Sequence, residues 1–486
     1  MTARRPEPFF SQESAFPQPR GRLLVLSYHF PPAQAAGALR WEKLAAFAAE
    51  RGWGLDVVTL DPGCLPAADW PRLVNVAAAI RVYGVPRRLP LAERLEQLLW
   101  NAYRRLQPPG HRHTGPSRRT RSSDDDALAQ AGLVPREQLR WRVTALWDHV
   151  RALEAWLDFA REGSWSRAAG ATALRLAQPG VHRAIVTCGP PHMVHLAGRF
   201  VSRRTGLPLV MDMRDPWSLN PAVPESLANP LWFWLAARHE RSAVRHAALV
   251  ITNTAPFRIA MQAVYPRAHN RIITVLNGCD EEPIPPAPVG RRFTIAYAGS
   301  IYLDRNPRLV FRAAARVVRE LELTPEQLGF DFLGYVEGFG GVPLGVMARE
   351  EGVGDYVRTY ATRPRREAMT FLAQAAMLLS LPQDTPLAIP SKLFEYLQFN
   401  AWLLVLAKRD SAIELLLRGT GADIVEPQNV DGMVEVLRTR YLQFTAGERP
   451  TRVVTNGRFS RRAQAHVLLD ALERCIERGD SRATEA

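Results

Sequence analysis

The chain has 486 residues, of which 47% are hydrophobic and 23% are charged. This length exceeds what one hydrophobic core normally accommodates, so we expect at least two domains. The composition is that of a globular protein rather than a disordered one. The net charge of +14 comes almost wholly from arginine, because only Lys43, Lys392 and Lys408 are lysines. No zinc-finger spacing, RNP-like run or basic heptad accompanies this charge, which argues against nucleic-acid binding.

Hydropathy and cysteine usage indicate a protein of the reducing cytoplasm. No stretch approaches about 18 uncharged apolar residues, so no transmembrane helix is expected. Residues 1–20 contain no apolar core of a signal peptide, and we interpret them as a disordered tail. The cysteines Cys64, Cys188, Cys279 and Cys475 are scattered and form no CxxC pair. They predict neither a disulfide framework nor a metal site.

The first elements predict a βαβ unit. A short apolar run at 23–26 precedes a turn-rich segment, an amphipathic helix is expected over 38–51, and a buried strand over 55–60. A strand, a crossover helix and a second strand within forty residues favour a parallel sheet.

The alternation breaks over about 85–165, which we interpret as an insertion. Helical apolar patterns occupy 91–106 and 138–160, and residues 101–123 contain six arginines and no acidic residue. Apolar area beside positive charge favours peripheral contact with an anionic membrane, here the inner face of the plasma membrane. Such helices also commonly pack on their own domain, so that alternative stays open.

The α/β rhythm then resumes on both sides of a proline-rich segment at 283–290. The expected strands lie at 184–187, 207–213, 248–252 and 272–276, and then at 294–298, 330–333, 357–360, 376–381, 402–406 and 422–425. We therefore predict an α/β fold of two doubly wound, Rossmann-like domains, over 21–285 and 290–455. A final helix within 456–480 is expected to pack back on the first domain.

Two doubly wound domains bind ligands where the carboxyl ends of their strands face a cleft. The GxGxxG fingerprint is absent after the first strand. A dinucleotide-dependent dehydrogenase is therefore disfavoured.

Six motifs, in order, resemble the retaining GT-B glycosyltransferases of family 4. They cover about 25–60 and 184–400. They are the opening Leu-Val-Leu-Ser-Tyr-His-Phe-Pro-Pro with Gly37 and Arg40, Cys-Gly-Pro-Pro-His (188–192), Asp-Met-Arg-Asp-Pro-Trp (212–217), Asn-Gly-Cys-Asp (277–280), Tyr-Ala-Gly-Ser (297–300) and Ile-Pro-Ser-Lys-Leu-Phe-Glu-Tyr-Leu (389–397).

The resemblance implies an enzyme of hexosyltransferase type in cell-surface polysaccharide biosynthesis. Its donor would be a UDP- or GDP-sugar, and its acceptor a glycan or a lipid-linked molecule. It implies no cofactor, no metal ion and transfer with retention, by attack on the sugar from the face that the diphosphate leaves.

A nucleotide-sugar needs cationic or N–H partners at its diphosphate, because negative charge grows there as the glycosyl bond breaks. A helix expected to start near Pro390 offers Ser391, free N–H groups and the side chain of Lys392. Gly299 ends a predicted strand and lets a phosphate approach the backbone. The resemblance places Arg305 where the family has a diphosphate-binding lysine. Alternatively, Lys392 and Arg305 are solvated charges on the protein surface and do not bind the diphosphate.

At two positions the chain departs from the family pattern, which weakens the assignment of the family's residue roles to it. Ser300 stands where the family has an arginine, which leaves Arg305 and Lys392 to bind the diphosphate. Glu395 matches the glutamate that accepts from the ribose hydroxyls, but Leu387 replaces the acidic residue eight positions earlier. These changes leave the identity of the sugar open. A helix-surface pairing is the alternative for Glu395.

The first domain is expected to supply the groups near the transferred sugar and the acceptor. His192 follows a predicted strand, at a location that faces the cleft. By resemblance it would lie near the transferred sugar or the acceptor, although His29 and His195 compete for that role. Asp215 is predicted to orient the acceptor or, alternatively, to pair with Arg214. Gly37 belongs to a small-residue loop that resembles the entry for donor phosphate and acceptor, and a plain turn glycine is its alternative.

Two other functions remain open. A nucleotide-sugar epimerase or hydrolase would need a carboxylate pair, which the sequence does not suggest. A non-catalytic GT-B subunit that binds a nucleotide-sugar or scaffolds an assembly complex is favoured by Ser300 and Leu387. Retention of Gly299, Arg305, Lys392 and Glu395 argues against it.

Overall fold

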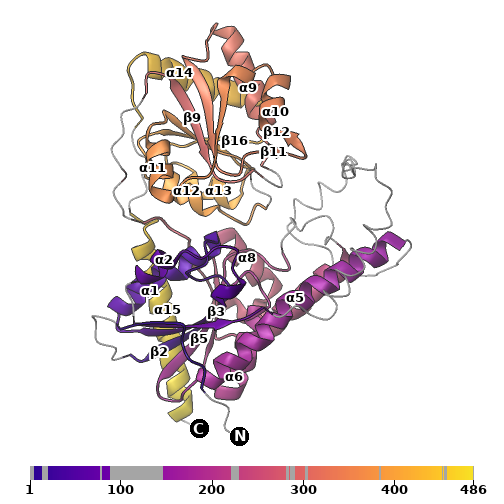
Figure 1. The fold of residues 1–486 in the computed structure, drawn as a ribbon, viewed down its shortest axis with the longest axis vertical. Helices are drawn as coiled ribbons and strands as arrows, with labels where there is room; N and C mark the ends of the chain where they lie inside the picture. Colours follow the sequence, from indigo (N-terminus) through magenta and orange to yellow (C-terminus); the bar gives the residue numbers. More distant parts are fainter. Residues whose placement is uncertain are drawn as a thin grey trace. The chain divides into compact units, whose positions relative to one another are not determined.

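The structure is a computed structural model of the chain (Figure 1). It describes residues 5–13, 20–76, 79–87, 146–219, 229–280, 284, 290–301, 305–382, 385–450, 453 and 457–484. The predicted helix at 91–106 and the arginines of 101–123 lie outside these residues, as does most of the proline-rich segment.

The chain folds into two compact units. The first comprises Met1–Asn253, Arg258–Val275 and Ala465–Ala486. The second comprises Thr254–Phe257 and Leu276–Gln464. The contact boundary at Val275 therefore lies before the proline-rich segment.

The first unit is built on an eight-stranded sheet of order β1-β4-β3-β2-β5-β6-β7-β8. Every pairing is parallel except that of the edge strand β1 with β4. The strands are β1 (Phe10–Gln12), β2 (Arg22–Ser27), β3 (Gly54–Leu60), β4 (Ile80–Val85), β5 (His182–Gly189), β6 (Leu209–Met213), β7 (Leu249–Thr252) and β8 (Ile272–Thr274).

Helices cover both faces of this sheet. Alternate strand residues such as Leu23 and Val57 pack with α1 and α15 in one core cluster. The long helix α5 contacts β2, β3 and β4, and α6 contacts β5 and β6; Figure 1 shows α6 beside the lower end of α5. The helices of this unit are α1 (Leu39–Glu50), α2 (Trp70–Val74), α5 (Leu146–Leu176), α6 (Val194–Thr205), α7 (Pro230–His246), α8 (Ala255–Val264) and α15 (Arg461–Thr484). The first residues of α8, up to Phe257, and of α15, up to Gln464, belong to the second unit.

Three features differ from the sequence prediction. Phe10–Gln12, within the predicted disordered tail, forms strand β1 by pairing with β4. The strand β4 was not predicted, because Arg81 and Gly84 interrupt its apolar run. The predicted end of the insertion at residue 165 falls inside α5, whose buried Trp165 and Ala169 belong to the helical layer on the sheet.

The second unit has a six-stranded parallel sheet of order β13-β10-β9-β14-β15-β16. Its strands are β9 (Phe293–Ala298), β10 (Leu328–Leu333), β13 (Val357–Tyr360), β14 (Met377–Ser380), β15 (Trp402–Leu406) and β16 (Asp423–Val425), and a small separate hairpin pairs β11 (Gly338–Phe339) with β12 (Val342–Pro343).

Alternation along these strands assigns their side chains to two cores. Ile295 and Phe330 pack with α9, α10 and α14, whereas Ala296 and Leu378 pack with α11, α12 and α13. The helices are α9 (Arg308–Glu320), α10 (Leu344–Glu350), α11 (Arg365–Ala373), α12 (Ser391–Tyr396), α13 (Ala412–Leu417) and α14 (Val430–Thr445). This arrangement, like that of the first unit, is the predicted doubly wound α/β architecture.

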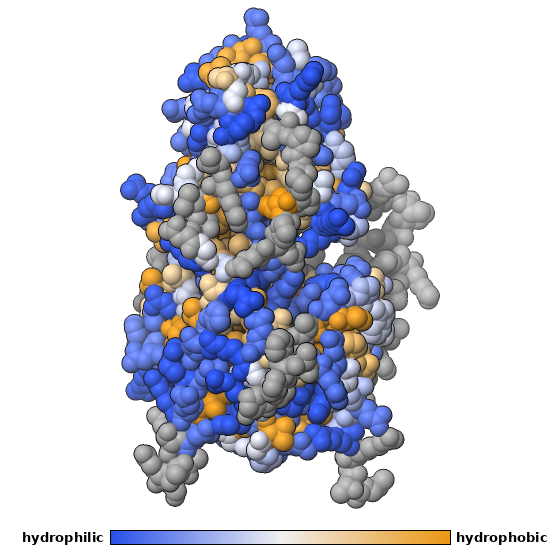
Figure 2. All heavy atoms as spheres, turned by 90° about the vertical axis from the view of Figure 1, so that its left-hand side faces the viewer, coloured by the Kyte–Doolittle hydropathy of each residue, from blue (hydrophilic) through white to orange (hydrophobic). Residues whose placement is uncertain are grey.

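Figure 2 shows one face of the molecule, on which hydrophilic residues predominate and hydrophobic ones form small separate groups. Within the described residues, no helix is both long and apolar enough to cross a bilayer.

Candidate functional site

Each sheet has one topological switch point, where consecutive connections leave in opposite directions. In the second unit it lies at β9, which has β10 on one side and β14 on the other; in the first it lies at β2, between β3 and β5. Ligands of doubly wound folds bind beside the carboxyl ends of such strands. Gly299 directly follows β9, and the segment that holds Gly37 follows β2.

The backbone turn after β9 is shaped by glycine and fixed by two tyrosines. Gly299 has a φ of 135°, a conformation that residues with a Cβ rarely adopt. A Cβ on Gly334, at the end of β10, would lie 2.5 Å from the carbonyl oxygen of Gly299. The hydroxyl of Tyr297 donates to the carbonyl of Ser300 at 2.7 Å, and the Ala298 N–H donates to the Tyr396 hydroxyl at 2.9 Å.

Two predicted cations meet at this turn. The Lys392 ammonium lies 3.6 Å from the centre of the Tyr297 ring and donates to the Ala298 carbonyl at 3.4 Å. Arg305 donates to the Ser300 carbonyl at 3.2 Å. Burial and the neighbouring Arg305 lower the pKa of Lys392 well below its ordinary value. The turn is therefore a site where an anion would relieve the desolvation of one cation and its repulsion from another.

Glu395 lies on the same helix as Lys392 and belongs to a chain of ion pairs. Its carboxylate pairs with Arg365, which also lies 3.8 Å from Asp280. Asp280 in turn pairs with the buried Arg461 at 2.5 Å. Sequence reasoning missed Arg365, because only the fold brings the start of α11 to α12. The carboxylate predicted to accept from ribose thus has a cationic partner within its own unit.

The helix α12 begins at Ser391, with Pro390 as its extended N-cap residue rather than inside the opening turn as predicted. Leu387 lies half-buried in the preceding loop, and its carbonyl accepts from the Thr254 hydroxyl at 2.5 Å.

In the first unit, Arg214 is the centre of the polar groups at the carboxyl ends of the strands. Its guanidinium donates to the Gly189 carbonyl at 3.2 Å and to the Pro190 carbonyl at 2.6 Å. A Cβ on Gly37 would lie 2.3 Å from the Arg214 Nη1 atom. Gly37 therefore makes room for this cation. The sequence prediction had given Arg214 only a pairing role.

His192 and His195 are both buried and uncharged. Burial, His195 and Arg214 lower the pKa of His192 well below its ordinary value, and burial lowers the pKa of His195 to about 3. The His192 ring stacks on Trp217 with ring centres 5.2 Å apart. His195 Nδ1 lies 2.8 Å from the Thr187 hydroxyl. Burial and Arg214 also lower the pKa of His29 to about 4.

Asp215 lies exposed in the loop after β6. Two residues further on, Trp217 is buried, and Ser218 binds the buried carboxylate of Glu240 through its N–H at 3.0 Å and its hydroxyl at 2.7 Å. Tyr265 donates to the same carboxylate at 2.7 Å. Glu240 thereby fixes the loop that carries Asp215.

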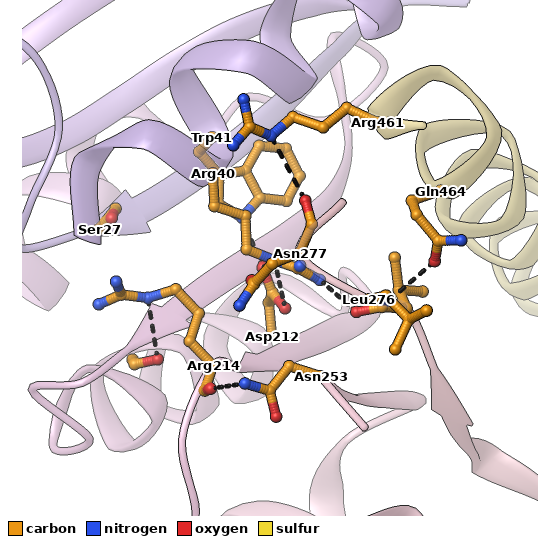
Figure 3. A network of polar contacts seen from close by, with 12 residues as sticks. Ser27, Arg40, Trp41, Asp212, Arg214, Asn253, Leu276, Asn277, Arg461 and Gln464 are labelled. Carbon is orange, nitrogen blue, oxygen red and sulfur yellow. Dashed lines mark hydrogen bonds and ion pairs between the residues drawn. The ribbon is translucent and has the colours of Figure 1, made fainter. Parts of the chain in front are cut away.

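Figure 3 shows how the end of β6 is anchored inside the first unit. The Asp212 carboxylate accepts from Arg40 at 2.8 Å and from the Trp41 indole at 2.9 Å. The Arg214 carbonyl accepts from the Asn253 side chain. These bonds join α1, β6 and the end of β7 beneath the site.

The structure thus brings the predicted residues together in two groups. Gly299, Ser300, Arg305 and Lys392 surround one turn in the second unit, with Ser391 and Glu395 on the same helix as Lys392. In the first unit, Gly37 and His192 lie around Arg214, and Asp215 follows it. Among the described residues, no cluster of three or more His, Cys, Asp or Glu side chains has the arrangement of a metal site.

Comparisons with known proteins identify the fold. No protein-family model matches the chain, and no curated protein matches it by sequence. Among solved structures, it is similar to the trehalose 6-phosphate synthase of Burkholderia multivorans, with a TM-score of 0.54 and 12% identity over 96% of this chain and 99% of that one. It is also similar to the sucrose-phosphate synthase of Thermosynechococcus elongatus (0.51, 13% identity, 94% and 98%) and to Anabaena HepE in complex with UDP-glucose (0.50, 14% identity, 96% and 100%).

These similarities extend over nearly the whole of both chains. The predicted fold is confirmed: the chain has the GT-B architecture of two Rossmann-like domains.

Proposed function

We propose that the chain is a retaining glycosyltransferase of family 4 type. It transfers a sugar from a nucleoside diphosphate sugar to a glycan or lipid-linked acceptor in cell-surface polysaccharide biosynthesis. The observation that carries the proposal is the pair of cations, Lys392 and Arg305, at the turn after β9. This turn lies at the switch point of the second unit, where doubly wound folds bind their ligands.

The chemistry of this turn suits a diphosphate leaving group. When the bond between the sugar C1 and the diphosphate oxygen breaks, negative charge grows on the diphosphate. Fixed cations at that position stabilise the transition state more than the ground state. Gly299 and Gly334 keep Cβ atoms away from the backbone there, and Glu395 supplies a carboxylate for the ribose hydroxyls.

Similar solved structures support the class of donor. Anabaena HepE was solved with UDP-glucose, and another similar structure is the UDP-forming trehalose-phosphate synthase of Burkholderia xenovorans. We propose a UDP- or GDP-sugar as the donor and assign the acceptor to the first unit. There Arg214 supplies a fixed cation, while Asp215 offers an exposed carboxylate that accepts from an acceptor hydroxyl.

The role of His192 follows from its uncharged state. A neutral imidazole held by Trp217 contributes a hydrogen bond to a sugar hydroxyl, not a charge. We therefore keep it as a sugar-binding residue and assign the charge stabilisation to Lys392 and Arg305.

The proposal is tested by release of nucleoside diphosphate from a panel of UDP-, GDP- and ADP-sugars. We expect one donor class to be turned over, and Lys392→Ala and Glu395→Ala to abolish that turnover. Lys408→Ala and Glu367→Ala are matched controls, because both side chains are exposed elsewhere in the same unit; they should leave it unchanged. Absence of donor binding in the wild type would refute the proposal.

A non-catalytic GT-B subunit is the second candidate, favoured by Ser300 and Leu387 at positions where the family has charged residues. It predicts that a nucleotide-sugar raises the melting temperature of the wild type, and not of Lys392→Ala, while no donor is turned over with any acceptor. Turnover by the wild type would eliminate this candidate.

A further inference from the structure

The outer sides of two adjacent helices in the first unit form a strongly basic surface. It carries Arg199, Arg203 and Arg204 on α6 and Arg238, Arg241 and Arg245 on α7. The one acidic residue of these two helices, Glu240, is fully buried and bound by Ser218 and Tyr265. Within the described part of the chain, none of the six arginines forms an ion pair with a carboxylate. We call this surface the α6–α7 basic face.

An arginine-rich composition alone does not explain this face. The helix α9 of the second unit also carries three arginines on one side, Arg308, Arg312 and Arg316. Each of them is paired with a carboxylate, at 2.6–2.9 Å for its shortest contact. Three of the four arginines on α9 are thus neutralised, whereas none of the six on α6 and α7 has a carboxylate partner in the described part of the chain.

The six arginines share one surface. Along α7, Arg238, Arg241 and Arg245 recur at intervals of three and four residues, and all three are exposed. Such spacing places side chains on one side of a helix. His246 Nε2 lies 2.9 Å from the Ser202 hydroxyl, which joins the carboxyl ends of the two helices. Burial lowers the pKa of His246, and the nearby positive charges of Arg199 and Arg203 lower it further.

Exposed aromatic rings interrupt the charge. Phe200 and Trp234 are 40% and 43% exposed. The guanidiniums of Arg204 and Arg238 each lie 5.2 Å from the centre of one of these rings. The face therefore presents apolar rings and cations in alternation.

We propose that the α6–α7 basic face binds the anionic headgroup surface of a phospholipid bilayer. Unpaired arginines attract the phosphates of acidic lipids, and exposed Trp and Phe side chains beside them suit the boundary between headgroups and acyl chains. A nucleic-acid duplex would use the same cations but offers no apolar layer to the two rings. This inference goes beyond the proposed transferase function and does not depend on it.

Vesicle co-sedimentation tests the proposal. We expect the full chain to bind vesicles of mixed phosphatidylglycerol and phosphatidylcholine and not vesicles of phosphatidylcholine alone, and salt to weaken the binding. Replacing Arg238, Arg241 and Arg245 together by Glu should lower partitioning by at least about 100-fold, since each basic residue near an anionic surface contributes about fivefold. The pair Phe200→Ser and Trp234→Ser should lower it about 5-fold or more with the charge unchanged.

A matched variant separates this face from net charge. Arg319, Arg409 and Arg474 are exposed elsewhere, and their joint replacement by Glu makes the same charge change. It should leave partitioning within about threefold of the wild type, because exposed charges beyond the Debye length of about 10 Å are screened. Equal losses in both triple variants, no binding of the wild type to anionic vesicles, or tighter binding to duplex DNA than to those vesicles would each overturn the proposal. Far-UV circular dichroism and cooperative thermal unfolding, unchanged in all variants, report that each is folded.

Discussion

At the scale of single residues, the first unit depends on the space that Gly37 leaves for Arg214. The guanidinium reaches the Gly189 and Pro190 carbonyls only because no Cβ stands at position 37. We predict that Gly37→Ala displaces the guanidinium and lowers turnover by about 10- to 100-fold, because small displacements of positioned groups have such effects. Steady-state assays of donor consumption measure this change.

The matched control is Gly345→Ala. A Cβ at Gly345 would come no closer than 3.8 Å to another residue, so turnover should stay that of the wild type. Arg214→Ala should reproduce the loss seen in Gly37→Ala. Wild-type turnover in Gly37→Ala would show that turnover does not depend on the position of the Arg214 guanidinium seen in the structure.

Lys392 predicts a pH dependence of donor binding. Its pKa is lowered in the free protein by burial and by Arg305, and a bound diphosphate would favour the protonated ammonium. As pH rises through the lowered pKa, binding must take up a proton, so donor affinity falls; below that pKa no uptake is expected. Calorimetry in buffers of different ionisation enthalpy measures the uptake above about pH 7.5, where the phosphates no longer titrate.

Lys392→Arg isolates this effect, because a guanidinium stays protonated throughout the range. The variant should bind the diphosphate without proton uptake. Uptake that persists in Lys392→Arg would assign the titration to another group.

At the scale of elements, the contact between α5 and α6 includes a carboxylic acid whose ionisation opposes folding. Burial and the neighbouring Asp158 raise the pKa of Glu162 to about 7, although its carboxylate accepts from the Met193 N–H at 3.4 Å. A raised carboxylate pKa means that the folded state retains a proton that the unfolded chain releases. Between the unfolded pKa of 4.5 and the folded value of about 7, the stability contribution therefore falls as pH rises.

We predict that Glu162→Gln removes this fall and is more stable than the wild type at pH 8, by up to about 3 kcal/mol. Urea unfolding of both proteins at several pH values gives the difference. Glu426→Gln, at an exposed position, should follow the wild type at every pH. A constant difference between Glu162→Gln and the wild type across this range would exclude the assignment.

The sequence predicted the elements that their own residues mark, such as apolar runs. It missed the elements that form only because they pair with a distant strand. The strand β15 (Trp402–Leu406) agrees with the prediction because its apolar run is fully buried on both faces. The strand β1 was missed because three residues ending in Gln12 carry no strand signal without the partner strand β4. In the candidate site, Lys392 was found from its motif, whereas Arg214 and Arg365 depend on contacts between segments far apart in the sequence.

At the scale of the whole molecule, the chain enters the second unit and returns to the first before it ends. The last helix, α15, contributes Leu468, Leu469 and Leu472 to a core that also holds the β2 residues Leu23 and Val25. One face of the first sheet is therefore completed only by residues more than 430 positions after the strand they cover.

We predict that Leu472→Ala destabilises the first unit by about 2–5 kcal/mol, the cost of removing a buried leucine side chain. Leu472 is fully buried, whereas Val467 on the same helix is 45% exposed. Val467→Ala should change the stability by no more than about 0.5 kcal/mol. Calorimetric unfolding with and without a nucleoside diphosphate assigns the transitions, since the ligand stabilises only the unit that binds it. The early transition of Leu472→Ala should not respond to the ligand, because the proposed diphosphate site belongs to the second unit. A ligand-sensitive early transition would show instead that the two units unfold together.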